Sequence, residues 1–197
     1  MKSNQQAKLK AGKITTVASV VVNSVLSILK TATGFATGST ALIADGIHSL
    51  ADLITDVFTY ALIRIAGKEP DEDHPYGHGK FETFGTMFLA IFLAGVSIAI
   101  GLEAVDAIQN SEHQKTLTYI ALIAAAVSIL ANEGLYHYCA YKGKQVNSSI
   151  IIANAWHHRT DSISSVAALV GIALNMYGFL MADAIAALFV TAFLLKI

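Results

Sequence analysis

The residues best suited to do chemistry lie inside stretches that are otherwise apolar. The segment ADGIHSLADLITD, residues 44–56, carries four ionisable residues at spacings of three, four and four: Asp45, His48, Asp52 and Asp56. On a helix this spacing places all four side chains on one face. A charged side chain at the centre of a bilayer costs at least about 2.5–3.5 kcal/mol, so such residues are candidates for function.

A second pair of the same kind occurs in the segment WHHRTD. His157 and Asp161 stand four residues apart, as His48 and Asp52 do. Imidazole nitrogens and carboxylate oxygens are metal ligands, and both pairs present them from one face of a helix. Two such pairs can bind one ion only if the elements that carry them bring the pairs to the same place.

Composition identifies a membrane protein. Of the 197 residues, 54% are hydrophobic and 14% are charged, whereas a soluble domain carries about 25% charged residues. The mean hydropathy is +0.56. A net charge of −1 provides no bulk attraction to nucleic acid. The single cysteine excludes a disulfide framework and a cysteine-rich zinc site.

The chain is predicted to be all-α, a polytopic membrane protein with six transmembrane helices. A hydrocarbon core of about 30 Å needs about 20 mostly apolar helical residues. Six segments qualify: Ile14–Phe35, Ala41–Ala66, Thr83–Ile108, Leu117–Tyr141, Ser148–Met176 and Gly178–Leu195. We expect residues 1–13 to form a cytoplasmic N-terminal segment and residues 14–197 to form one six-helix transmembrane domain.

The distribution of positive charge predicts the orientation. Lysine and arginine cluster before the first segment, between the second and third, and between the fourth and fifth, while the other connections are nearly free of them. Positively charged loops remain in the cytoplasm, so both termini should be cytoplasmic. Lys30, inside the first segment, is expected to extend its ammonium group to the outer interface.

Depth then brings the two pairs together. With antiparallel neighbours, His48 and Asp52 lie about 12–18 Å from one surface, and His157 and Asp161 lie about 14–20 Å from the other. Both pairs therefore fall near the midplane, where two imidazoles and two carboxylates form a tetrahedral set suited to Zn²⁺. The alternative is that these residues are ion pairs or hydrogen-bonded groups that hold helices together.

The loop EPDEDHPYGHGKFE offers a second candidate site. Pro75 and the neighbouring glycines prevent a regular helix here, so the segment should be a loop. In this loop a second cation at the cytoplasmic surface could be bound by Asp71, His74 and His78. The alternative is a solvated acidic loop. Within the second segment, Asp45 and Asp56 could line a water-filled pathway or orient a ligand.

Three motifs together resemble the cation diffusion facilitators, a family of metal-efflux transporters: GSTALIADGIHSLADL, DEDHPYGHGKFE and ANAWHHRTDSISS. The resemblance covers about Lys10 to Lys196. It implies a transport site of His48, Asp52, His157 and Asp161, and an auxiliary site of Asp71, His74 and His78. A histidine at position 48 resembles the zinc-selective branch, and Asp183 matches an aspartate with a structural role. Typical members also dimerise through a cytoplasmic C-terminal domain. This chain ends after the sixth segment and does not contain that domain, so we expect the chain to be either truncated or naturally shorter.

The function expected from these features is efflux of a divalent metal by alternating access, with Zn²⁺ moving out as protons move in. We expect the protein not to be an enzyme. We also expect it to form a homodimer and to lie in a prokaryotic inner or plasma membrane. Fe²⁺, Co²⁺ or Cd²⁺ could replace zinc, because divalent metals overlap in affinity. A non-transporting partner subunit, a passive channel and a di-iron lipid enzyme are the rival interpretations.

Overall fold

The computed structural model describes residues 2–66, 75, 77–78, 80–109 and 118–194, and this part of the chain is helical with no strand. Six helices follow one another: α1 (Lys2–Thr37), α2 (Thr40–Ala66), α3 (Lys80–Gln109), α4 (Tyr119–Gln145), α5 (Ser149–Met176) and α6 (Ala182–Leu194). The predicted all-α fold class is confirmed, and each helix overlaps one predicted segment.

The boundaries differ most at α1 and α6. Helix α1 begins at Lys2, twelve residues before the predicted apolar segment, because the basic stretch consists largely of good helix formers and contains no proline. Helix α6 begins at Ala182 rather than Gly178, since Gly178 has a φ of 102° and belongs to the turn after α5. Hydropathy therefore located the apolar spans rather than the helix ends.

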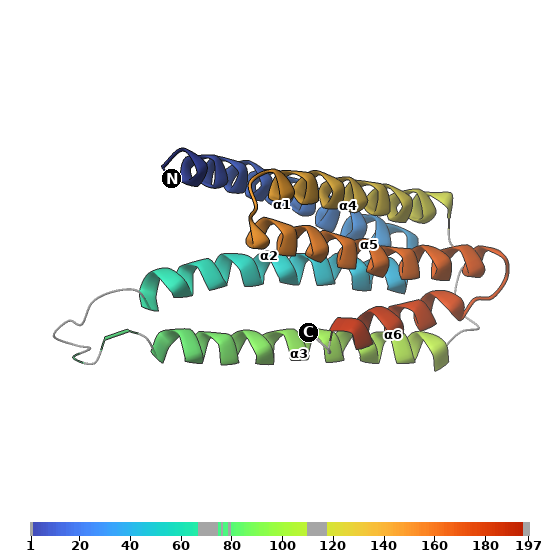
Figure 1. The fold of residues 1–197 in the computed structure, drawn as a ribbon. Helices are drawn as coiled ribbons and strands as arrows, with labels where there is room; N and C mark the ends of the chain where they lie inside the picture. The colour runs from blue at the N-terminus through green and yellow to red at the C-terminus, as the bar shows by residue number, and fades with distance from the viewer. Residues whose placement is uncertain (1, 67–74, 76, 79, 110–117, 195–197) are drawn as a thin grey trace.

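The helices run side by side (Figure 1), and their packing partners are specific. Helix α2 is central, because it packs against α1, α3, α5 and α6. Helix α4 covers α1 and α5, while α3 and α6 pair with each other along one side of the bundle. The elements that carry the two predicted ligand pairs, α2 and α5, are in direct contact.

Small residues allow close helix packing in this bundle. A Cβ atom added at Gly34 of α1 would lie 2.8 Å from the backbone nitrogen of Ile43, and one added at Gly46 of α2 would lie 2.7 Å from that of Thr31. The two glycines thus face each other's helix at neighbouring levels. Inside a membrane there is no hydrophobic driving force between helices, so small residues stabilise a helix pair by allowing close van der Waals contact. Helices α1 and α2 consequently form a tight pair.

The surface of the bundle is apolar. Large exposed side chains such as Val17, Ile28, Phe88 and Ile91 lie on α1 and α3. Within the described residues, three stretches are long and apolar enough to cross a membrane: Lys10–Thr37, Thr83–Gln109 and Tyr119–Gln145. Helices α2 and α5 are as long but carry the ionisable residues, and α6 provides a shorter apolar stretch, Ala182–Ala192. The six-span topology and its orientation remain predictions.

Replacing Gly46 with alanine should loosen the α1–α2 pair. The new Cβ would collide with the backbone of Thr31, and overpacking of this kind costs about 1–3 kcal/mol. Gly134 of α4 is the matched control, because a Cβ there meets no atom within 4 Å and alanine favours helix by up to about 1 kcal/mol. Thermal unfolding in detergent should show a lower midpoint for Gly46→Ala only; equal midpoints would contradict the close approach.

Candidate metal centre

The two His-x-x-x-Asp pairs meet between α2 and α5. His48 Nε2 lies 3.6 Å from Asp52 Oδ2. From α5, His157 Nε2 lies 3.8 Å from Asp161 Oδ2 and 4.0 Å from Asp52 Oδ2. Ligand atoms of His48, Asp52 and Asp161 all lie within 4.8 Å of one another. The structure therefore brings together the four residues that the sequence placed at one depth.

These distances suit a divalent cation that draws the ligands slightly inward. Zinc–ligand bonds of about 2.0–2.2 Å in a tetrahedron place neighbouring ligand atoms about 3.4 Å apart. The three His–Asp separations of 3.6–4.0 Å exceed this value by a few tenths of an ångström, while the ligand atoms of His48, Asp52 and Asp161 stay within 4.8 Å of one another. His157 lies outside the mutually close set of three, so its ring would move furthest to complete a tetrahedron.

Burial divides the four ligands into an inner and an outer half. The side chains of His48 and Asp161 are only 2% and 7% exposed, whereas those of Asp52 and His157 are 23% and 41% exposed. Neither ring nitrogen of His48 makes a hydrogen bond to any described residue. A buried imidazole without hydrogen bonds is costly, and a metal ion is the natural partner for its free lone pair.

A small polar cavity adjoins His157 on the side of α1. It has a volume of about 50 Å³, and its lining includes Ser19, Asn23, Asn154 and His158. His158 Nε2 lies 2.7 Å from Ser19 Oγ, and the Asn154 amide donates to the same hydroxyl at 3.3 Å. His158 thus contacts α1 and joins α5 to it. The sequence pattern alone does not indicate this role.

The prediction that Lys30 extends its ammonium group to the outer interface is wrong. Its side chain is fully buried rather than extended to an interface, and its ammonium donates to Asp45 Oδ2 at 3.0 Å and to Ser49 Oγ at 2.7 Å. Asp45 also accepts hydrogen bonds from the hydroxyls of Ser164 and Ser165 on α5. An ion pair completed by hydroxyl donors satisfies both charges locally, so the lysine has no need of water.

Some of the other predicted site residues lie outside the part of the chain that the structure describes. These are Asp71, His74 and the side chain of Asp56. His78 is described: it is buried, and its ring stacks on Phe81 with centroids 5.6 Å apart. The second cation site in this loop therefore stays a prediction.

Asp183 acts at the start of α2 from its place on α6. It accepts hydrogen bonds from the Ser39 hydroxyl at 2.7 Å and from the Ala41 backbone N–H at 3.2 Å. Helix N-termini expose such unpaired N–H groups and favour a negative charge. These bonds tie α6 to the first turn of α2, in keeping with the structural role that the resemblance implies.

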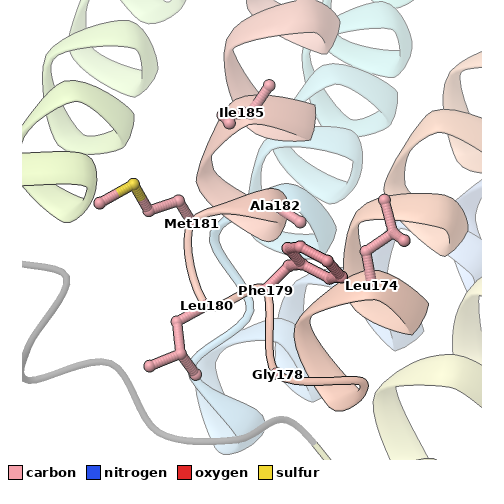
Figure 2. Close-up of a pocket in the computed structure, with 7 residues that line it drawn as sticks. All are labelled: Leu174, Gly178, Phe179, Leu180, Met181, Ala182 and Ile185. Atoms are coloured by element: carbon pink, nitrogen blue, oxygen red, sulfur yellow. The ribbon is translucent and has the colours of Figure 1, made fainter.

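A larger hollow elsewhere in the bundle has a different character. It measures about 690 Å³ and is lined only by apolar residues around the α5–α6 turn, with Phe179 and Leu174 prominent in Figure 2. Leu174 lies thirteen residues beyond Asp161, about 20 Å along α5. A cavity without a polar side chain cannot replace the water around a cation. The ligand set between α2 and α5 is the better candidate site.

The family follows from comparison with known proteins. Residues 16–197 match the cation efflux transmembrane domain. The chain belongs to this family. The resemblance to cation diffusion facilitators that three sequence motifs indicated is thereby confirmed.

Individual relatives of this cation efflux chain come from all domains of life. It is 39% identical to an uncharacterized transporter of Methanocaldococcus jannaschii over 91% of this chain and 63% of the relative. It is 38% identical to the manganese efflux system protein MneP of Bacillus subtilis, over 90% and 62%. Mitochondrial metal transporter 1 of Saccharomyces cerevisiae is 33% identical, over 98% and 42%. The chain thus spans about three fifths of the first two relatives.

Replacing Lys30 with methionine should destabilise the protein strongly. Removing one partner of a buried ion pair leaves an uncompensated charge and costs about 3–5 kcal/mol. The double variant Lys30→Met with Asp45→Leu should recover most of the loss, because neither charge remains. Ser49→Ala, which removes only one neutral partner of the ammonium, should cost about 1 kcal/mol. Unfolding midpoints in detergent would measure all three; a double variant no better than Lys30→Met would contradict the pairing.

Proposed function

We propose that this chain moves a divalent metal ion across the membrane, with Zn²⁺ as the preferred substrate and protons as the counter-ion. The observation that carries the proposal is the convergence of His48, Asp52, His157 and Asp161 inside an apolar bundle, with three His–Asp separations of 3.6–4.0 Å. Two carboxylates and two neutral imidazoles hold a charge of −2, which a divalent cation neutralises.

The donor set supports zinc over manganese. Imidazole suits Zn²⁺ and Fe²⁺, whereas Mn²⁺ favours sets of oxygen ligands. The relative from Bacillus subtilis is named for manganese efflux, so the family does not fix the metal of this chain. Half of the present set is nitrogen, and four ligands match the tetrahedral preference of Zn²⁺. Efflux of Fe²⁺, Co²⁺ or Cd²⁺ by the same mechanism is the second candidate, because the same ligands serve these ions.

The uneven exposure of the ligands suggests the order of binding. An ion meets His157 and Asp52 first, since these side chains are the exposed half, and then reaches the buried His48 and Asp161. Binding requires neutral imidazoles and ionised carboxylates, so capture of the ion releases any protons that these groups hold. Protons from the opposite side then displace the metal after the bundle has opened there, as in other alternating-access transporters.

The remaining expectations belong to this proposal. Both termini would be cytoplasmic in a prokaryotic inner or plasma membrane, and two chains would form a homodimer. Asp71, His74 and His78 would supply an auxiliary cation site, and Asp45 would act through its contacts with Lys30 and α5. Asp56 would line the metal's route.

Asp52→Ala should abolish transport, because the Asp52 carboxylate lies within 4.0 Å of the ring nitrogens of both His48 and His157. In liposomes with a trapped zinc dye, flux through the unaltered protein should follow an imposed pH gradient and should vanish in the variant. Glu133→Gln is the control, since Glu133 is an ionisable residue of α4 that contacts Arg159 rather than the ligand set. Flux indifferent to the gradient would indicate a channel, and zinc binding without flux would indicate a partner subunit.

His48→Asp should widen the choice of metal. The change replaces a borderline nitrogen ligand with a hard oxygen ligand, and even outer-shell changes typically cost 10–100-fold in metal affinity. We expect zinc affinity to fall by at least about tenfold and manganese binding to improve. Competition titrations with Zn²⁺, Cd²⁺ and Mn²⁺ would measure this, and an unchanged order of affinity would contradict the selectivity argument.

A further inference from the structure

A hollow with a positively charged rim lies where α1 and α4 leave their apolar spans. It measures about 260 Å³ and has three residues on α1, Lys10, Ala11 and Ile14, and three at the end of α4, Lys142, Gln145 and Val146. Lys10 is the first residue of the apolar stretch of α1, and Gln145 is the last of α4. In a bilayer this level is the boundary between hydrocarbon and headgroups.

No described carboxylate compensates the positive charge of this hollow. The sequence contains no aspartate or glutamate in residues 1–44 or 134–160, the two stretches from which its walls are built. Among the described residues, no carboxylate pairs with Lys10 or Lys142, nor with the nearby Lys13 and Lys144; Lys142 lies only over the ring of Tyr141, 5.8 Å from its centroid. An anion is the ligand that such a rim attracts.

Half of the lining residues and the adjoining surface are apolar. Ala11, Ile14 and Val146 line the hollow together with the two lysines. Along α1 the exposed side chains of Ile14, Val17 and Val21 continue on one helical face, away from the lysines and into the span. The surface therefore combines a cationic site for a headgroup with an apolar track for an acyl chain.

We propose that this hollow binds the phosphate headgroup of an anionic phospholipid, with one acyl chain against the Ile14–Val21 face of α1. Lys10 and Lys142 approach the phosphate from two different helices, each as a compact positive charge with three donors. The Gln145 amide provides a neutral donor for the glycerol or phosphate oxygens. A bound lipid would link the ends of α1 and α4 on the surface of the bundle.

The test compares two double variants with equal loss of charge. Lys10→Gln with Lys142→Gln removes the two lysines of the hollow, and Lys13→Gln with Lys144→Gln removes two exposed neighbours that do not line it. The purified proteins would be titrated with phosphatidylglycerol in phosphatidylcholine nanodiscs, and bound lipid would be counted by native mass spectrometry. Helix content would be checked by circular dichroism.

We expect one phosphatidylglycerol per chain to bind the unaltered protein and the control. The variant of the hollow should bind it roughly 30-fold more weakly, which corresponds to the loss of two lysines at an anionic membrane surface. Equal weakening in both double variants would overturn the proposal in favour of a diffuse charge effect. Displacement of the lipid by an equal concentration of inorganic phosphate would show that the site takes a free anion, and would overturn the assignment to a lipid.

Discussion

The bundle depends on compensating charge where water is absent. Lys30 and Asp45 do this internally: their ion pair, completed by Ser49, Ser164 and Ser165, gathers three helices around one neutral cluster. Three residues further along α2, about 4.5 Å along the helix axis, His48 begins a second polar layer, to which none of the described lysines contributes. This layer gathers two carboxylates and two histidines, all of which are metal-ligating groups, whereas the first layer is closed by an ion pair between protein groups. The first layer is therefore structural, and the second suits a mobile ion.

The neighbouring contacts fix some helices more firmly than others. Facing glycines hold α1 to α2, and the hydrogen bonds of Asp183 hold α6 to the start of α2. Helix α5 is joined to α1 through His158 and Ser19 at the level of the ligands. The ligand layer thus lies where the tightly packed α1–α2 pair meets α5, a helix that also packs closely on α4 and α6.

Much of the candidate site could be predicted because its information is local. A spacing of four residues places His48 with Asp52 and His157 with Asp161, and simple depth along two antiparallel helices brings the pairs to one level. The fate of Lys30 could not be predicted in this way. Whether a lysine extends to an interface or pairs inside depends on which helix packs against it. The serines that complete the hydrogen bonds of its partner Asp45 lie on α5, more than a hundred residues away. The first residue of α1 could not be predicted from hydropathy, because hydropathy locates the apolar span and not the full length of the hydrogen-bonded helix.

The position of Lys30 also bears on how the chain enters a membrane. An unpaired lysine within a membrane helix opposes insertion, by up to about 2.5–3.5 kcal/mol when it lies at the helix centre. Its partner Asp45 follows only fifteen residues later, across the α1–α2 turn, so the pair can form as soon as those two helices exist as a hairpin. The serines on α5 emerge from the ribosome much later. Biogenesis of this protein is therefore expected to begin with joint insertion of α1 and α2, with the hydroxyl groups of α5 completing the cluster when the rest of the bundle assembles.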